Sequence, residues 1–467
     1  MKGWQLAVIA LFQLLPVGLL AQAGMSDMLD TSAAPRSWTL GAQAIPVGTI
    51  QSPAHADRTY REGYLSQPMV MATLSRGNHI ELYGMLDLEG LTLDRGELDA
   101  GIYGEGYIDR RHPHTYMHEL VASAGGATKR VGYSVAVGKG FVPFGTDDPM
   151  VRPFEKYPVN HHISQVVERL LASLAVSSGP VLLEAARFNG DEPEYPSDFP
   201  NSGRLWDSWA GRVTLKPISE LELQSSVARV KSPELATGGG LDQRKVNVSL
   251  RFESIPSTRA DSGGQGVAPM PMGGIAGMSG TSGMQMPDAA NDVWHQYLLV
   301  EWGRSAEYAG SMQAFAFTTT LAEAEFSHAG VAFALRWERT ERPEEERLAD
   351  PFRTLRPAND FSIIGRTRWN VTSARLTGGI YQWPIGTISP FIEVARQHAT
   401  ALARAQAFDP AGFYGSNTMW GTSVGLAITA GMIHRRTGQY GNSARQRSGP
   451  TMSMRGTASR RGVFDRP

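Results

Sequence analysis

Several segments of the chain alternate between apolar residues and polar or small ones. In KVNVSLRFE (245–253), the apolar Val246, Val248, Leu250 and Phe252 fall on one face, with polar residues between them. The same pattern recurs in VAFALRWE, LELQSSVA and WGTSVGLAIT. A period of two is typical of a β-strand with one apolar and one wet face. About fifteen segments of this kind run along the chain, and helical periodicity is nearly absent.

Three features favour a membrane barrel over a soluble sheet protein. The segments have the length of membrane-crossing strands, about 9–11 residues. Their polar faces carry charges, such as Arg251 with Glu253 and Arg336 with Glu338, which suit a water-filled lumen and would be costly in a dry core. Aromatic residues often stand near the segment ends, as an interfacial girdle requires. We therefore predict an all-β, single-domain, antiparallel transmembrane β-barrel of about 14 strands, with 12 to 16 tolerated. A soluble periplasmic all-β protein is the alternative.

The first residues predict a secretory signal. One Lys precedes an apolar run that ends in Ala21-Gln22-Ala23, a small-x-small pattern typical of signal peptidase sites, so we assign 1–23 to a signal peptide. Removing it takes one Lys and no acid from 44 Lys plus Arg and 45 Asp plus Glu, which changes the net charge from −1 to −2. Such a charge gives no footprint for nucleic acid. The chain has no cysteine, so it uses no disulfide framework.

Composition divides the rest of the chain. Residues 24–66 are rich in Ser, Ala, Pro and Gly and predict a flexible N-terminal periplasmic segment. Residues 67–437 hold the predicted outer-membrane barrel. Residues 438–467 predict a disordered, Arg-rich tail.

A Gly- and Met-rich stretch, 254–293, interrupts the barrel segments and predicts a long loop. We expect the segments before and after it, KVNVSLRFE and WHQYLLVEW, to pair as a hairpin. With an even strand number and both termini in the periplasm, we expect the loop to be extracellular. Thioethers are soft ligands that favour Cu(I), so the loop is a candidate copper site; a disordered spacer is the alternative. The candidate ligands are Met270, Met272, Met278, Met284 and Met286.

A second group of candidate residues gathers around two histidine-rich segments, DRRHPHTYMHE (109–119) and YPVNHH (157–162). We expect a polar cluster at or just inside one rim of the barrel. Its members are Asp109, Arg110, His112, His114, His118, Glu119, His161 and His162. Three interpretations stay open: a structural polar network, a solute- or ion-binding constriction, and a transition-metal site, since imidazole suits Zn and Cu. H-E-x-x-H does not occur, and the G-x-S-x-G match at 421–425 lies inside the alternating segment WGTSVGLAIT, so hydrolase chemistry lacks its usual support.

Six segments also carry a resemblance to known proteins. They are GEGYIDRRHPHTYMHEL with its D-R-x-H-P-H core, GKGFVPFGTDDPMVRP, YPVNHHISQ, RFNGDEPE, DSWAGRVTLKP and MIHRRTGQYG. In these the chain resembles a family of porin-like outer-membrane proteins of Gram-negative bacteria. GKGFVPFG is more distantly similar to phosphate-selective porins. The resemblance covers most of 80–440 and implies a barrel in the outer membrane, with no established substrate.

These observations together predict an outer-membrane, porin-like channel for passive or weakly selective passage of small solutes or ions. The expected partners are outer-membrane lipid, the solutes or ions, and the barrel assembly machinery, with no nucleic acid. We expect no cofactor other than the copper considered above and no enzymatic activity. A copper-associated outer-membrane protein and an outer-membrane hydrolase are the alternative functions.

Overall fold

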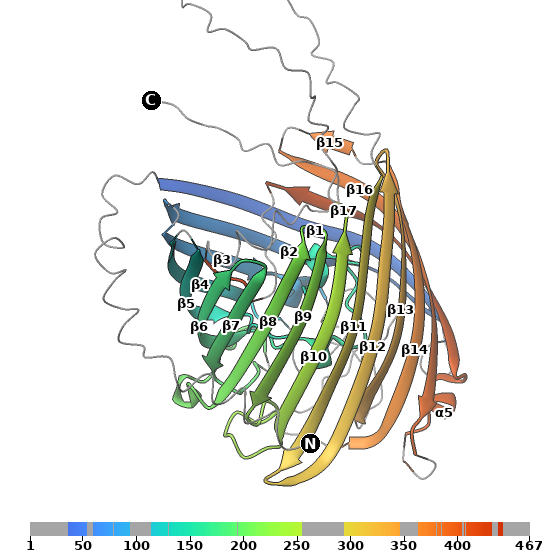
Figure 1. The fold of residues 1–467 in the computed structure, drawn as a ribbon. Coiled ribbons are helices and arrows are strands. Elements are labelled where there is room, and N and C mark those ends of the chain that lie inside the picture. The colour runs from blue at the N-terminus through green and yellow to red at the C-terminus, as the bar shows by residue number, and fades with distance from the viewer. Residues whose placement is uncertain are drawn as a thin grey trace, which may run out of the picture.

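The computed structural model describes residues 36–53, 59–77, 79–93, 114–128, 130–193, 195–254, 294–345, 363–379, 381–383, 385–403, 406, 408–431 and 438–441. Antiparallel strands dominate it (Figure 1). The strands are β1 Arg36–Ser52, β2 Tyr60–Arg76, β3 Ile80–Asp87, β4 Met117–Ala127, β5 Val131–Gly140, β6 Arg169–Ser178, β7 Val181–Phe188, β8 Ser208–Ile218, β9 Leu221–Val230, β10 Asp242–Glu253, β11 His295–Ala309, β12 Met312–His328, β13 Val331–Glu345, β14 Ile363–Thr377, β15 Tyr381–Trp383, β16 Gly386–Ala401 and β17 Thr418–Ala430. The helices are α3 Glu89–Thr92, η3 Pro149–Val151, α4 His161–Ser164, η4 Ser202–Arg204 and α5 Pro410–Tyr414. Among the described residues, none of these helices has the length and apolar character needed to cross a membrane.

The strands form a closed wall because the first one pairs with the last. β1 pairs with β2 on one side and with β17 on the other, where Ala42 lies opposite Ala430. Within the described residues the wall holds 16 strands, and β15 pairs only with β16 and stands outside it. The expected all-β, single-domain antiparallel barrel is confirmed. The favoured number of 14 strands is wrong, although 16 lies within the tolerated range.

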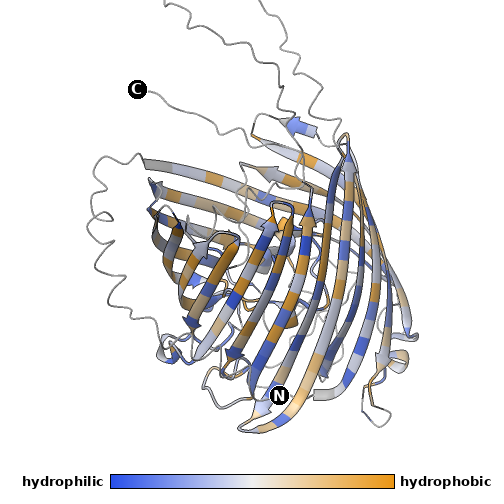
Figure 2. Ribbon diagram, viewed as in Figure 1, coloured by the Kyte–Doolittle hydropathy of each residue, from blue (hydrophilic) through white to orange (hydrophobic). Residues whose placement is uncertain are grey.

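The two faces of the wall differ in polarity. On β10, Val246 and Val248 point outward and are 37% and 46% exposed, whereas Asn247 and Arg251 point inward and are 1% and 8% exposed. Figure 2 shows the same alternation of apolar and polar positions along the other strands. An apolar outer face and a polar interior suit a barrel surrounded by lipid and would be unstable in water. This excludes the soluble all-β alternative and confirms a membrane-spanning wall.

The connections differ between the two ends of the barrel. We call the end where β1 begins and β17 finishes the terminal end, and the opposite one the distal end. Most connections at the terminal end are tight turns, at 77–79, 128–130, 179–180, 219–220 and 329–330. Most connections at the distal end are long, at 88–116, 141–168, 189–207, 231–241, 346–362 and 402–417. Outer-membrane barrels have short periplasmic turns and longer extracellular loops, so the terminal end is the periplasmic one.

This orientation corrects the expected place of the Met-rich stretch. β10 and β11 pair along their length, from Asp242 opposite Tyr308 to Glu253 opposite Tyr297, so the expected hairpin is confirmed. Both strands meet this stretch at the terminal end, because β10 is the tenth strand from the N-terminus and runs back toward the end where β1 began. The stretch therefore leaves the wall on the periplasmic side, and the extracellular placement is wrong. The five methionines lie outside the described residues.

Two boundaries also differ from expectation. Residues 36–52 form β1 and residues 60–66 begin β2, so these residues are not part of a flexible segment. The alternation in β1 was hidden because its outward positions hold Ala44, Pro46 and Gly48, while Ile45 and Val47 point inward. At the other end, Tyr440 is 4% exposed and packs inside the barrel, so the predicted disordered tail does not begin at 438. The signal peptide and the rest of the tail lie outside the described residues.

A loop folded into the barrel supplies part of the core. Residues 141–168 connect β5 to β6 at the distal end, and we call them the lumen loop. Phe144 and Phe154 of this loop are fully buried. Phe144 clusters with apolar side chains of the wall, among them Leu171 of β6 and Phe188 of β7. The hydrophobic core therefore sits between the wall and the lumen loop.

Candidate functional site in the barrel lumen

The lumen loop is held to the wall by buried ion pairs. Arg152 of the loop donates to Glu323 of β12, with Nη2 3.0 Å from Oε2. Arg336 of β13 donates to the same carboxylate from Nε at 2.6 Å. Arg336 also donates to the backbone oxygens of Lys156 and Phe154, at 2.7 and 3.2 Å. Glu323 thus joins one guanidinium from the loop to one from the wall.

Two more ion pairs fix the same stretch of the loop to later strands. Lys156 Nζ lies 2.6 Å from Glu393 of β16. Arg375 of β14 lies 3.2 Å from the Glu155 carboxylate and donates to the Pro153 oxygen at 3.2 Å. All these side chains are buried, and removing one partner of such a pair typically costs about 3–5 kcal/mol. The loop position is therefore defined by charge pairing from β12 to β16.

Hydrogen bonds complete the attachment around the rest of the barrel. Glu301 of β11 accepts from Asn160 at 2.6 Å and from the hydroxyls of Thr146 and Ser164. Lys245 of β10 donates to the His162 oxygen at 2.5 Å. Other contacts reach Gln67 of β2, Arg212 of β8, Ser226 of β9 and Glu338 of β13. The loop crosses the lumen and is tied to strands on all sides of it.

The histidines gather beside this loop because of a β-bulge. Met85 of β3 lies opposite Glu119 of β4, and the next residue, Leu86, lies opposite Met117, so His118 has no opposite residue on β3. A bulge of this kind redirects side chains at a strand end. His118 and Glu119 consequently both point into the barrel, and His118 is fully buried.

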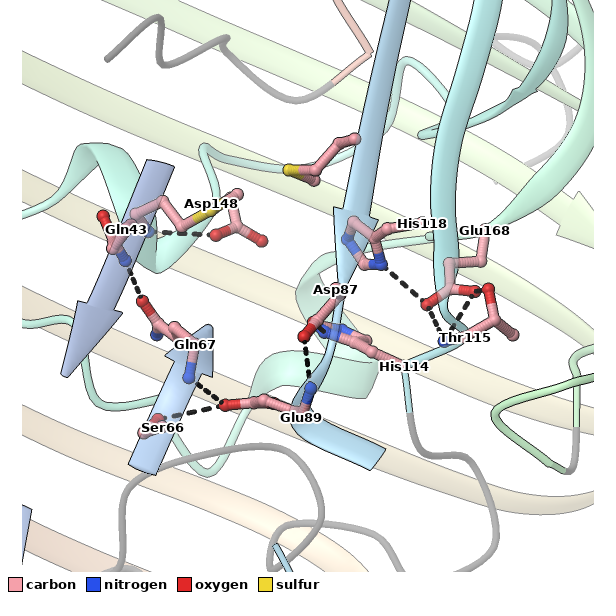
Figure 3. A network of polar contacts seen from close by, with 12 residues as sticks. Gln43, Ser66, Gln67, Asp87, Glu89, His114, Thr115, His118, Asp148 and Glu168 are labelled. Carbon is pink, nitrogen blue, oxygen red and sulfur yellow. Dashed lines mark hydrogen bonds and ion pairs between the residues drawn. The ribbon is translucent and has the colours of Figure 1, made fainter. Parts of the chain in front are cut away.

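Each of two imidazoles is held by a carboxylate (Figure 3). His114 Nδ1 lies 3.0 Å from Asp87 Oδ2, and His118 Nδ1 lies 2.8 Å from Glu168 Oε1. The ring centroids of the two histidines are 4.2 Å apart. An ionised carboxylate only accepts hydrogen bonds, so both rings carry their proton on Nδ1 and direct Nε2 away from the carboxylate.

Glu168 is the most densely bonded carboxylate of the cluster. It accepts from Lys139 Nζ at 2.8 Å, from the Thr115 hydroxyl at 2.6 Å and from the Thr115 backbone N–H at 3.0 Å. Burial alone would raise the pKa of Glu168, but the Lys139 ammonium and the His118 ring outweigh it and hold this pKa well below its usual range. Glu168 is therefore a fixed negative charge.

Asp148 lies on the loop side of the cluster. Its Oδ1 accepts from the Met150 N–H at 2.9 Å, which caps η3. Its Oδ2 is buried and has no hydrogen-bond partner among the described residues. Burial raises the pKa of Asp148, against the lowering by the Met150 N–H and by His161, His114 and His118.

The opposite side of the cluster joins β1, β2 and the loop. Glu89 accepts from the Ser66 hydroxyl at 3.0 Å and from the Gln67 N–H at 2.7 Å. Gln67 in turn contacts Gln43 of β1 at 2.5 Å and donates to the Glu155 oxygen at 2.7 Å. The first strands therefore share one network with the lumen loop.

The structure brings together four of the predicted residues and separates others. The centroid of His161 lies 6.2 Å from that of His114, and His162 lies 5.2 Å from His161. Glu119 also points inward, but it accepts from the Tyr440 hydroxyl at 2.5 Å. Asp109, Arg110 and His112 lie outside the described residues.

Four members of the cluster escaped the sequence analysis: Asp87, Lys139, Asp148 and Glu168. Asp87 is the last residue of an alternating strand, a position that only weakly indicates a site residue. Lys139 stands in GKG near the end of β5, where the sequence does not distinguish it from other charged residues expected at a barrel rim. Glu168 has a φ of +55°, a backbone conformation that the sequence does not predict. Asp148 belongs to a loop whose inward fold could be suspected only from its 28 residues between two strands (141–168).

No protein-family model matches the chain, and no curated protein matches it. The anion-selective porin from Comamonas acidovorans is similar to it at 10% identity and a TM-score of 0.46, covering 85% of this chain and 100% of that one. OmpT, an outer membrane protein of Vibrio cholerae, is similar at 8% identity and a TM-score of 0.43, covering 84% and 97%. OpdQ of Pseudomonas aeruginosa is similar at 9% identity and a TM-score of 0.39, covering 84% and 98%.

The architecture rests on the chain's own features. The wall is closed by the pairing of β1 with β17, its outer face is apolar, and a loop from the distal end fills part of its polar interior. The D-R-x-H-P-H motif and the similarity to phosphate-selective porins stay predictions. The described residues form a closed antiparallel β-barrel with an apolar outer face, as a wall that spans a membrane requires.

Proposed function

We propose that this protein is a channel through which small hydrophilic solutes or ions cross the outer membrane by a path narrowed by the lumen loop. The observation that carries the proposal is the anchoring of that loop, through Glu323 between Arg152 and Arg336, inside a closed and polar-lined wall. A loop that served only at the cell surface would need no buried charge pairs with strands on the far side of the lumen.

Paired charges of both signs face the barrel interior. Arg212 and Glu184 pair across β7 and β8 at 2.7 Å, and Arg251 of β10 lies 3.5 Å from Asp147 of the loop. Rings of charged side chains govern which ions pass a pore. Mixed charge that is largely paired favours weak selectivity among small polar solutes over a strong preference for one ion. The barrel would reach its place through outer-membrane lipid and the barrel assembly machinery.

The test is conductance of the purified, folded protein in planar lipid bilayers. We expect discrete steps of current and a reversal potential in a salt gradient that indicates only a modest preference for one ion. A folded barrel that inserts into liposomes but gives no current and no uptake of small sugars or amino acids would overturn the proposal. Copper binding by the Met-rich stretch stays a separate prediction.

A further inference from the structure

Polar side chains from the wall and from the lumen loop gather in one buried cluster. His114 precedes β4 and His118 lies at its start, whereas Asp148 and His161 belong to the loop. The Asp148 carboxylate lies within electrostatic reach of all three imidazoles, and Figure 3 shows it beside His118 in the same network. Donor atoms of Asp87, His114 and His118 all lie within 4.8 Å of one another.

Two atoms at this point lack a protein partner. His118 Nε2 and Asp148 Oδ2 are buried, and neither has a hydrogen-bond partner in the described part of the chain. Both side chains are fully buried. A buried polar atom left unsatisfied costs about 1–3 kcal/mol. One of these atoms is an imidazole lone pair and the other is a carboxylate oxygen, and both are electron-pair donors.

The surrounding carboxylates are placed as they are around metal-binding histidines. A metal-bound histidine usually donates its other ring N–H to a carboxylate, which fixes the tautomer and the ring orientation. Asp87 does this for His114, and Glu168 does it for His118. Asp87 is an orienting group and not a ligand, because its Oδ1 already accepts from the Glu89 N–H at 2.8 Å and its Oδ2 from His114.

We propose that His114, His118, His161 and Asp148 bind one divalent transition-metal ion of the Zn²⁺ class, with Asp87 and Glu168 as orienting residues. Three imidazoles and one carboxylate form a borderline donor set that suits Zn²⁺, and four protein ligands make a closed, structural site. Two ligands belong to the wall and two to the lumen loop, so the ion cross-links the loop to β4. This site is separate from the Met-rich stretch, whose soft thioethers favour Cu(I).

The test uses the full-length protein, purified in detergent without an affinity tag and freed of metal by a chelator. Zn²⁺ is titrated in competition with a chromophoric chelator, and Co²⁺ replaces it to report geometry by visible absorption. We expect one Zn²⁺ per folded chain and the intense absorption bands of four-coordinate Co²⁺. Folding is checked by the difference in gel mobility between unheated and boiled samples.

Two ligand variants, one orienting-residue variant and one control decide the outcome. Asp148→Asn keeps the shape of the side chain, and His118→Ala removes a ring; we expect each to weaken Zn²⁺ binding at least 100-fold and to abolish the Co²⁺ bands. Glu168→Gln should weaken binding about 10- to 100-fold, as loss of an orienting carboxylate does. His398→Ala, on β16 beside Thr418, should change nothing.

The proposal is overturned if the folded wild type takes up no stoichiometric Zn²⁺. It is also overturned if folded Asp148→Asn binds Zn²⁺ as tightly as the wild type. Because conductance is measured separately, loss of the metal site leaves the channel proposal standing, and absence of current leaves the metal site standing.

Discussion

Glu323→Gln tests whether buried charge pairing holds the lumen loop in place. The substitution removes the negative charge that Arg152 and Arg336 share and leaves two buried guanidiniums facing a neutral amide. Loss of one partner from a buried pair costs about 3–5 kcal/mol. Arg336 keeps its bonds to the Lys156 and Phe154 oxygens, so the lower value applies. Since 1.36 kcal/mol is a factor of ten, about 3 kcal/mol shifts the ratio of docked to undocked loop by about a hundredfold.

The assay is single-channel recording, with limited proteolysis of the folded protein beside it. We expect frequent transitions to a higher conductance level in Glu323→Gln, and faster cleavage within 141–168 than in the wild type. Glu341→Gln is the matched control, because it also removes the partner of an arginine, Arg368, but at a partly exposed site where an ion pair is worth about 0–1 kcal/mol. Identical current traces and cleavage rates for the wild type and Glu323→Gln would refute the reasoning.

Four further outcomes are expected. The protein should fractionate with the outer membrane and run differently on gels before and after boiling; recovery in the soluble periplasm without detergent would contradict the barrel. Protease added to intact cells should spare the stretch 255–293, and protease admitted to the periplasm should cut it; cleavage in intact cells would reverse the assigned orientation. If that stretch captures Cu(I), replacing Met270, Met272, Met278, Met284 and Met286 by Leu should abolish copper binding, and unchanged binding would make it a spacer. Glu168→Gln should lower the temperature of the boiling-induced mobility change at pH 7. The folded pKa of Glu168 is below its ordinary 4.5, so the stability that the ionised carboxylate contributes is present above pH 4.5 and is lost as the pH falls through the folded pKa. The difference in transition temperature between variant and wild type should therefore narrow below about pH 4.5. A difference that does not depend on pH would show that the charge of Glu168 is not its cause.

The sequence was enough to predict the wall because side chains that face lipid must be apolar and those that face the lumen can be polar. Val246 and Val248 must face outward and Asn247 inward, so the period of two is visible without any structure. β1 was missed because Ala44, Pro46 and Gly48 interrupt the large apolar side chains of its outward face, Trp38, Leu40 and Ile50. Because β1 was missed, the number of strands could not be determined from the sequence.

The candidate site could be predicted only in part, because its geometry depends on long-range packing. The histidine-rich segment 109–119 placed His114 and His118 in one predicted cluster, but their partners come from other elements. Asp87 ends β3, and Asp148 comes from a loop whose inward fold is decided by pairing with strands as distant as β16. The bulge at His118 turns that ring inward, and no local sequence pattern predicts the bulge.

The residues that follow β17 bear on the order of assembly. Tyr440 accepts the Phe141 N–H at 2.6 Å and donates to Glu119, a residue 321 positions earlier in the chain. The seam between β1 and β17 likewise joins residues far apart in the sequence, such as Ala42 and Ala430. Closing so long a loop costs conformational entropy before the contacts contribute stability, so such contacts form late in folding. Closure of the seam and docking of Tyr440 therefore both depend on residues from 418 onward, and neither can take place before these residues reach the folding barrel.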